Sequence, residues 1–307
     1  GYHEASQVAT EYLKELTLDQ WKSRNSDEPG HSNEFLTMIA KTAITGKTLE
    51  TSLDSVAQLC VDAVTAAGNV DNVRVLSLPG GSIDDSYLFK GVVLNKDLVG
   101  GSDSKPSTMV VSSLLLNTGL EMEKSEDNVQ VQLDAQSYQS FKDSGKNDLL
   151  SRAEKIRAFL EEGNNKECDD SSIIFVRDGV AESVVAYLKK HNIKVIHRLP
   201  ESSMKALSNA LNVEIYQTPD DISKCGHCIW EVEKHNDVNY TFVRHNCDDG
   251  KESTLILRGA TTTTLDEVER GFDDALGVVS LVLNNGGAVH GGGSAYVAMA
   301  SHLRTRA

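Results

Sequence analysis

The sequence has no long hydrophobic run and no excess of positive charge. Its longest apolar stretch, residues 109–116, is far shorter than the roughly eighteen residues that a membrane-spanning helix requires. The formal net charge of −15 argues against nonspecific binding to nucleic acid or to an anionic membrane surface. No secretory signal is predicted at the start of the sequence. We therefore expect neither a nucleic acid nor a membrane among the partners.

Cysteine is also scarce, with five residues in 307. A scattered and odd-numbered set is typical of a reducing compartment, which predicts a cytoplasmic protein. One group has the ligand types for zinc: Cys225 and Cys228, followed by His245 and Cys247. A hairpin turning at residues 235–237 would bring Cys228 near His245. Because Cys-x-x-Cys is common by chance and no second copy occurs, we expect reduced thiols and no metal; a zinc-stapled interaction domain is the alternative.

Hydrophobic periodicity predicts helices at both ends of the chain and alternating strands and helices between them. The first part should hold three helices with one polar loop, at residues 2–16, 35–44 and 53–67, with the loop at 17–32. Strands are expected at 72–78, 88–94, 109–116, 173–176, 194–197, 214–216 and 254–257, with a hairpin at 228–233 and 239–245. Helices are expected between them at 149–160, 180–190 and 203–211. This alternation predicts a mixed α/β layer structure, and the helical segments on either side predict one domain inserted into another.

Residues 265–293, LDEVERGFDDALGVVSLVLNNGGAVHGGG, carry the most specific local pattern. Thr264 and Glu267 predict a capping box at the start of a helix. Its apolar face should comprise Leu265, Val268, Phe272, Ala275, Leu276, Val279 and Leu283. Glu267, Arg270 and Asp274 fall on the opposite face. A carboxylate in this position can orient a water for hydrolysis, whereas the alternative is an Arg270–Asp274 ion pair on a solvated face.

Three consecutive glycines, Gly291, Gly292 and Gly293, precede a second short helix that starts near Ser294. Glycines allow the backbone to approach a ligand closely, and the N-terminus of the following helix favours anions. The alternative is a flexible joint without a ligand.

Seven short motifs in a fixed order resemble those of one family. They are Gly1-Tyr2 with Ala5, Ile39-Ala40-Lys41-Thr42 running into Ile44-Thr45-Gly46-Lys47, Val61-Asp62-Ala63-Val64, Gly80-Gly81-Ser82-Ile83-Asp84-Asp85-Ser86 with Gly91-Val92-Val93, Leu257-Arg258-Gly259-Ala260, Asp266-Glu267-Val268-Glu269-Arg270 with Asp274-Ala275, and Gly291-Gly292-Gly293. The chain resembles a subunit of a group II chaperonin, the family of the archaeal thermosome and the eukaryotic TCP-1 ring complex. Gly226-His227-Cys228 is similar to the theta subunit of the eukaryotic complex.

The resemblance implies a specific domain organisation. It predicts an apical polypeptide-binding domain at residues 71–258, inserted into a mostly helical intermediate domain at residues 17–70 and 259–284. Residues 1–16 would be the end of an equatorial helix, and residues 285–307 the start of a second equatorial segment. Residues 120–146 would form the helical protrusion that acts as a built-in lid. The implied partners are unfolded or partly folded client proteins and other subunits of a double ring.

The resemblance also assigns roles to individual residues. Asp274 matches the aspartate that positions the water attacking the ATP γ-phosphate, Lys47 matches the lysine that senses this phosphate, and Gly291, Gly292 and Gly293 match the segment against the base and ribose. One position departs from the family pattern, because Tyr296 stands where a glutamate is usual. Two parallel helices, at residues 149–162 and 180–191, would form the polypeptide-binding face. On the second helix, Val180, Val184 and Leu188 should pack inward, while four residues should face outward toward the client: Ser183, Ala186, Tyr187 and Lys190.

The family's acidic phosphate-binding loop, Gly-Asp-Gly-Thr-Thr, does not occur in this sequence. Binding of ATP with Mg²⁺ needs that loop, so we expect ATP and Mg²⁺ as cofactors of a full-length subunit and none for this fragment. The sequence thus predicts the polypeptide-binding and hinge part of an ATP-dependent cytosolic chaperonin, without ATPase activity of its own. Besides the zinc-stapled domain, a stand-alone nucleotide hydrolase using Asp274 and Lys47 is an alternative.

Overall fold

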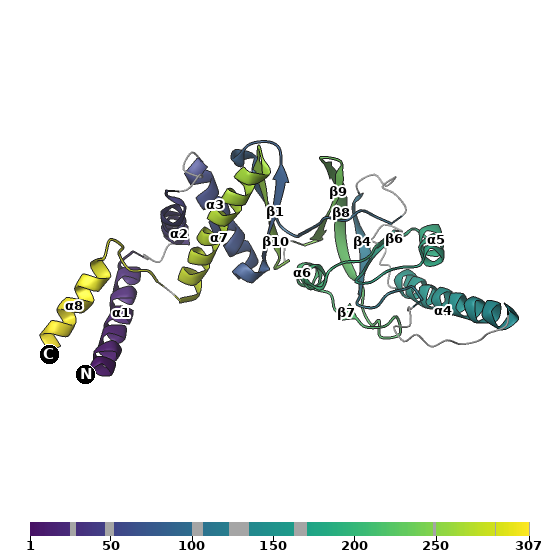
Figure 1. Ribbon diagram of the computed structural model, residues 1–307, viewed down its shortest axis with the longest axis horizontal. Helices are drawn as coiled ribbons and strands as arrows, with labels where there is room; N and C mark the ends of the chain where they lie inside the picture. The colour runs from purple at the N-terminus through teal and green to yellow at the C-terminus, as the bar shows by residue number, and fades with distance from the viewer. Residues whose placement is uncertain are drawn as a thin grey trace. The chain divides into compact units, whose positions relative to one another are not determined.

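The computed structural model describes residues 1–24, 29–46, 52–99, 107–122, 135–162, 171–247, 250–285 and 287–306. The chain divides into two compact units (Figure 1). The first unit comprises Gly1–Leu88 and Leu255–Ala307, and the second unit comprises Phe89–Thr254. Within the described ranges, no helix is both long enough and apolar enough to cross a membrane.

The first unit is mostly helical. Its core forms between α2 (Pro29–Ile44), α3 (Leu53–Ala67) and α7 (Thr262–Asn285). A three-stranded sheet in the order β1 (Val73–Pro79), β10 (Ser253–Gly259) and β2 (Tyr87–Phe89) packs against these helices through Leu255 and Leu257. Two single-turn 3₁₀ helices, Val70–Asn72 and Ile83–Asp85, lead into β1 and β2.

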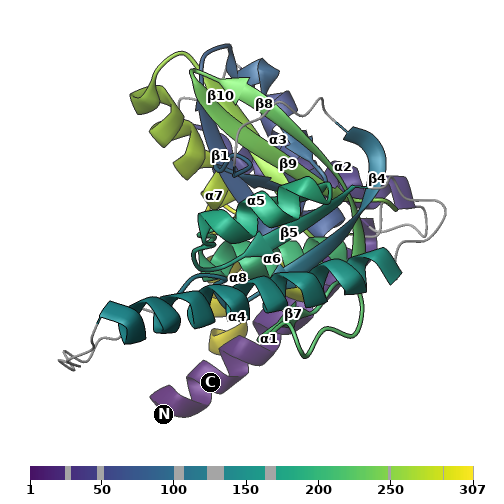
Figure 2. The same cartoon turned by 90° about the vertical axis from the view of Figure 1, so that its right-hand side faces the viewer.

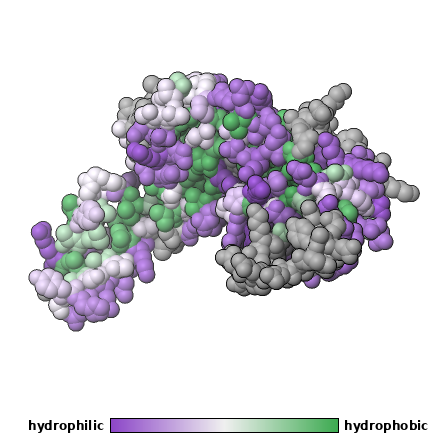
Figure 3. All heavy atoms as spheres, turned by 45° about the vertical axis from the view of Figure 1, so that its right-hand side comes forward, coloured by the Kyte–Doolittle hydropathy of each residue, from purple (hydrophilic) through white to green (hydrophobic). Residues whose placement is uncertain are grey.

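Two further helices of the first unit, α1 (Tyr2–Arg24) and α8 (Ser294–Arg306), contact each other. The rings of Tyr12 and His302 stack with their centroids 4.0 Å apart. Hydrophobic side chains are exposed on both helices (Figure 3), and Tyr2, Tyr296 and Val297 are 100%, 76% and 71% exposed. The pair therefore presents apolar surface to its surroundings.

The second unit is built on a seven-stranded sheet. Its strand order is β3 (Val92–Leu94), β9 (Val238–His245), β8 (Gly226–His235), β4 (Ser107–Leu116), β5 (Ser172–Val176) and β6 (Ile193–Ile196), with β7 (Ile215–Tyr216) also paired to β4. β4, β5 and β6 run parallel to one another. β3, β9 and β8 are antiparallel to their neighbours, and β8 joins this part of the sheet to β4. α4 (Ala135–Glu162) and α5 (Glu182–Lys190) contribute to the core on one face of the sheet (Figure 2). α6 (Glu201–Leu211) contributes to a second core on the other face.

The mixed α/β fold class predicted from the sequence is confirmed. The hairpin of β8 and β9 turns at Asn236 and Asp237, which both have positive φ angles, and pairs Cys228 with His245 as expected. Residues 73–88, which the sequence analysis placed in the inserted segment, cluster with the first unit because β1 and β2 both pair with β10.

Three expectations about helix length are wrong. Residues 17–24 continue α1, and α2 begins at Pro29, so the expected loop is replaced by helix at both of its ends. Proline suits the first turn of a helix because no intrahelical N–H bond is needed there. α4 begins at Ala135 rather than near residue 149, because its first turns are polar residues that tolerate helix.

Candidate functional site

Asp274 lies on α7, which begins at Thr262, two residues before Thr264, the residue that was predicted to cap it. The cap is Thr261, whose Oγ1 accepts a hydrogen bond from the backbone N–H of Thr264 at 3.2 Å. The prediction of a capping box formed by Thr264 and Glu267 is therefore wrong. Glu267 instead accepts a hydrogen bond from Nη1 of Arg270 at 3.1 Å.

The buried face of α7 is largely as predicted. Leu265, Val268, Phe272, Ala275, Leu276 and Val279 are at most 2% exposed. The last turn differs, because Val282 is buried and Leu283 is 42% exposed. Asp274 lies on the exposed side of the helix, as the spacing predicts. Its side chain is therefore accessible to water.

Two further carboxylates accompany Asp274 on α7. Glu269 accepts a hydrogen bond from the hydroxyl of Ser77 on β1 at 2.9 Å. Burial raises the pKa of Asp273, and the negative charges of Glu269 and Asp274 raise it further. This part of α7 is thus strongly acidic, and its electrostatic potential favours a cation or a proton donor.

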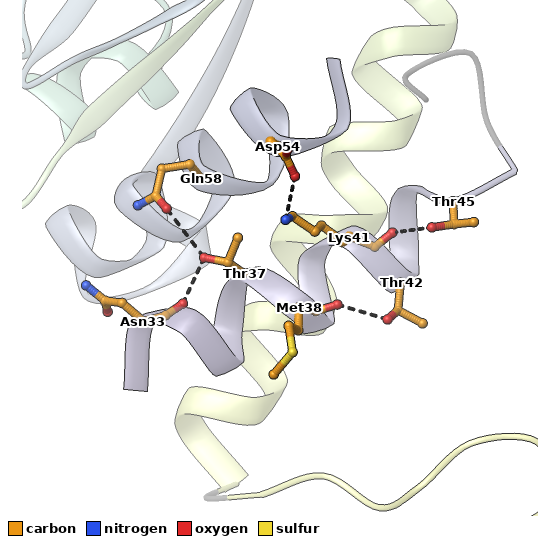
Figure 4. A network of polar contacts seen from close by, with 8 residues as sticks. All are labelled: Asn33, Thr37, Met38, Lys41, Thr42, Thr45, Asp54 and Gln58. Atoms are coloured by element: carbon orange, nitrogen blue, oxygen red, sulfur yellow. Dashed lines mark hydrogen bonds and ion pairs between the residues drawn. The ribbon is translucent and has the colours of Figure 1, made fainter. Parts of the chain in front are cut away.

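A polar network connects α2 and α3 (Figure 4). Nζ of Lys41 lies 2.5 Å from Oδ1 of Asp54, and the hydroxyl of Thr37 donates to Oε1 of Gln58 at 3.4 Å. Gly46, two residues after the end of α2, has a positive φ of 83°. Lys47, the predicted sensor, lies outside the described residues. An ion pair as exposed as Lys41–Asp54 contributes about 0–1 kcal/mol to stability.

The triple glycine forms a tight turn before α8. Gly292 and Gly293 have φ angles of 67° and 80°, which glycine adopts at little cost. The hydroxyl of Ser294 donates to the carbonyl of His290 at 2.8 Å and closes the turn. A groove of about 440 Å³ extends to Gly291 and is lined mainly by apolar residues of α2, α7 and the segment before the turn: Phe35, Ile39, Ala43, Val278, Val282, Ala288 and Val289.

The Gly-Gly-Ser-Ile-Asp-Asp-Ser motif has a structural role that sequence reasoning did not assign. Oδ2 of Asp85 accepts a hydrogen bond from the backbone N–H of Ser82 at 2.7 Å, and a Cβ on Gly81 would lie only 2.9 Å from that carboxylate oxygen. The hydroxyl of Ser86 accepts a hydrogen bond from the backbone N–H of Arg258 at 3.0 Å. The motif therefore fixes the turn from β1 to β2 around β10.

The predicted polypeptide-binding residues lie on α5 of the second unit. Val180, Val184 and Leu188 are buried, as expected, and Val185 joins them. Ser183, Ala186 and Lys190 are exposed, so the structure brings these three together on the outer face of the helix. Tyr187 is half-buried, and its ring lies 4.9 Å from that of His191. The face is therefore small and mixed in polarity, with one partly accessible aromatic ring.

The cysteine and histidine cluster does not form a metal site in the part of the chain that the structure describes. Cys228 lies opposite His245, but it is fully buried, and burial raises the pKa of its thiol to about 12. Nδ1 of His245 lies 2.9 Å from the carbonyl oxygen and 3.1 Å from the backbone nitrogen of Cys247. Across the described ranges, no three side chains of His, Cys, Asp or Glu are placed to hold a metal ion. The zinc-stapled alternative has no support.

Comparisons with known proteins agree with the fold and the motifs. The model of the TCP-1/cpn60 chaperonin family matches residues 1–307. Thermosome subunit 1 of Haloferax volcanii is 30% identical over 313 residues, which cover 99% of this chain and 52% of that protein. A thermosome subunit of Methanopyrus kandleri is 30% identical over 317 residues, which cover 99% of this chain and 54% of that protein. The chain thus spans about half the length of these curated relatives.

The fold comparison leads to the same family. A solved structure, the open-state monomer of a group II chaperonin from Methanococcoides burtonii, matches with a TM-score of 0.73 and 26% identity, over 100% of this chain and 68% of that chain. The ordered motifs, the family match over the full chain and this shared fold show that the chain belongs to the TCP-1/cpn60 chaperonin family, in its group II, thermosome-type branch.

Proposed function

We propose that this chain is the client-binding and hinge part of a chaperonin subunit that helps other proteins to fold. The observation that carries the proposal is the family match over residues 1–307. The second unit would be the apical domain, and α2, α3 and α7 would belong to the intermediate domain. α1 and α8 would belong to the equatorial domain, which agrees with their exposed Tyr2, Tyr296 and Val297.

Client binding would use the exposed face of α5 together with the neighbouring α4. Ser183, Ala186 and Lys190 provide a mixed polar and apolar surface, and Tyr187 adds a partly accessible ring. A surface of this kind suits weak binding of many unfolded polypeptides, because no single side-chain pattern is required of the client. The surfaces of other ring subunits and a lid formed by residues 120–146, of which 123–134 lie outside the described residues, would enclose the bound client.

A charge on this face tests the proposal. We expect Ala186→Glu to weaken binding of a fluorescently labelled, reduced and carboxymethylated polypeptide at least about tenfold, because a central interface residue would become charged. The matched control is Ser202→Glu, which adds the same charge to an exposed position of α6 on the other face of the sheet. Fluorescence anisotropy titrations would measure both affinities. Equal affinities for the two variants would contradict the proposed face.

The nucleotide would be ATP with Mg²⁺, bound by a full-length subunit. Asp274 fits the role of orienting a water because its carboxylate is exposed on α7. The positive φ angles of Gly292 and Gly293 fit a backbone that lies close to a ligand at the N-terminus of α8. Lys47 would contact the γ-phosphate. ATP bound there would supply the phosphoanhydride bond whose hydrolysis drives closure of the ring.

This chain alone would lack ATPase activity because the phosphate-binding motif Gly-Asp-Gly-Thr-Thr does not occur in its 307 residues. A phosphate-release assay with Mg²⁺ and ATP should show no turnover above buffer. Turnover that disappears in Asp274→Ala would instead favour the stand-alone hydrolase.

The cellular location of the chain and its subgroup within the chaperonin family are further proposals. A cytoplasmic location agrees with the reduced thiols of Cys60, Cys228 and Cys247. Gly226-His227-Cys228 favours a relation to the eukaryotic TCP-1 ring complex and its theta subunit.

A further inference from the structure

The turn that leads from β5 into α5 is held by residues from two other segments. Leu120 donates its backbone N–H to the carbonyl of Gly179 at 2.9 Å and accepts the N–H of Ala181 at 2.9 Å. The N–H of the residue between them, Val180, points elsewhere and donates to Nδ1 of His197 at 3.2 Å. His197 follows β6, so its ring connects the start of α5 to the end of a neighbouring strand.

α5 depends on this turn more than a longer helix would. It has nine residues, and its N-cap position is Ala181, which makes no side-chain capping bond. Helices this short are marginal by themselves, because few hydrogen bonds offset the cost of the first turn. The first intrahelical bonds, from Val184 and Val185, both end on the carbonyl of Ala181 at 3.0 Å. The position of Ala181 therefore sets the position of the whole helix.

The backbone around His197 is held in an unusual conformation. Arg198 has a φ of 54°, in the left-handed region that residues other than glycine seldom adopt. It is kept there because the N–H of Arg198 donates to the carbonyl of Asp178 at 3.0 Å, and that of Leu199 donates to the carbonyl of Val176 at 3.3 Å. The segment after β6 is thus pinned to the segment after β5, which brings the imidazole to Val180.

The hydrogen bond from Val180 specifies the protonation state of His197. A backbone N–H only donates, so Nδ1 must present its lone pair, and the proton of the neutral ring sits on Nε2. An imidazolium carries protons on both nitrogens and would place two donors face to face.

Burial lowers the pKa of His197, and the positive charges of Arg198 and Lys96 lower it further, while the carboxylate of Glu121 opposes this. Among the residues that the structure describes, these three are the charged groups that act on the ring. Glu121 itself lies against Gly179 in the same turn. The surroundings therefore favour the neutral acceptor form near neutral pH.

We infer that His197 is a positioning residue for the client-binding face: its Nδ1 holds the first turn of α5, and protonation of the ring releases this turn and weakens client binding. The inference rests on the proposed function of α5 and adds acid sensitivity to it.

The test compares His197→Asn and His197→Leu with the unchanged chain. The Oδ1 of asparagine is attached to Cγ as Nδ1 is, so it can accept the same N–H but cannot take up a proton near neutral pH. Leucine offers no acceptor. Because the pKa of His197 is lowered, the pH range has to reach well below the ordinary histidine value of about 6.5. Between about pH 7.5 and about pH 4.5, affinity of the unchanged chain for the labelled, carboxymethylated polypeptide should fall about tenfold, which is the contribution of one buried hydrogen bond.

Under the same conditions, His197→Asn should keep its neutral-pH affinity, and His197→Leu should bind about tenfold more weakly at every pH. His245→Asn is the matched control, because it removes another histidine of the same unit that lies away from α5, with its Nδ1 against the backbone of Cys247. It should retain the pH dependence of the unchanged chain. A His197→Asn variant that still loses affinity in acid would overturn the inference, whether or not the leucine variant folds.

Amide hydrogen exchange over residues 180–190 separates this inference from the proposed function. Acid pH, corrected for the intrinsic exchange rate, should raise exchange there in the unchanged chain and not in His197→Asn. If no form binds the polypeptide but this exchange pattern is found, the client-binding proposal fails and the role of His197 in positioning α5 stands. Exchange that is independent of His197 would refute the positioning role itself.

Discussion

Truncation of Phe272 on α7 should lower the stability of the first unit more than truncation at most of its other positions. Its ring is fully buried in the core that α2, α3 and α7 share. Phe272→Ala removes the transfer free energy of a buried ring, about 1.5–3 kcal/mol. It also leaves a cavity that, at about 24 cal/mol per Å³, adds a further one to two kcal/mol. We expect the free energy of unfolding of this unit to fall by about 3–5 kcal/mol.

Leu283 on the same helix provides the matched comparison. The spacing of apolar residues places both side chains in the core, but Leu283 is 42% exposed. Leu283→Ala should therefore cost less than about 1 kcal/mol.

The assay has to report on the first unit alone, since a chain with two units need not unfold in a single two-state step. Hydrogen exchange of α3 and α7 amides at increasing urea concentrations would provide the free energy of opening for each variant. If Leu283→Ala cost as much as Phe272→Ala, the burial assigned to the last turn of α7 would be wrong.

Three further predictions concern charge, backbone conformation and thiol reactivity. Because the pKa of Asp273 is raised in the folded state, the folded chain holds its proton more tightly and stability falls as pH rises past about 3.8. Asp273→Asn should therefore stabilise the chain at neutral pH and not at acid pH, as urea titrations at both would show. Gly293→Ala has open space around it, so its cost of about 1–2 kcal/mol comes from the positive φ alone. Gly291→Ala, at a position without a positive φ, should be nearly neutral, and hydrogen exchange of α8 would rank the two. Iodoacetamide at mildly alkaline pH should label the exposed Cys247 and leave Cys228 unmodified until the chain unfolds, as peptide mass spectrometry would reveal.

Local patterns predicted the elements whose signals are complete within a short stretch. α3 has the predicted bounds, 53–67, because its apolar spacing ends at Gly68, which caps the helix in the left-handed conformation. The hairpin was predictable because Asn236 and Asp237 tolerate positive φ angles. The predicted helix at 2–16 is shorter than α1 because residues 17–24 are mostly polar, although nothing in them prevents a helix.

The candidate sites were predictable to different degrees. The exposure of Asp274 followed from helical spacing, whereas its hydrolytic role rests on the resemblance and stays a prediction. His197 gave no signal in the sequence, because its acceptor role is defined by the N–H of Val180 on another element. Contacts of this kind depend on strand order, which no local pattern contains.

The division of the chain has a consequence during synthesis on the ribosome. The second unit is one continuous stretch, residues 89–254, whereas the core of the first unit joins α2 and α3 to α7, which is made after it. At about 5–20 residues per second, this stretch takes roughly ten to thirty seconds to translate. During that time the apolar faces of α2 and α3 have no α7 to cover them. A nascent chain of this chaperonin family therefore exposes the kind of surface that chaperones bind, and the inserted unit can complete its fold before the unit that surrounds it in sequence.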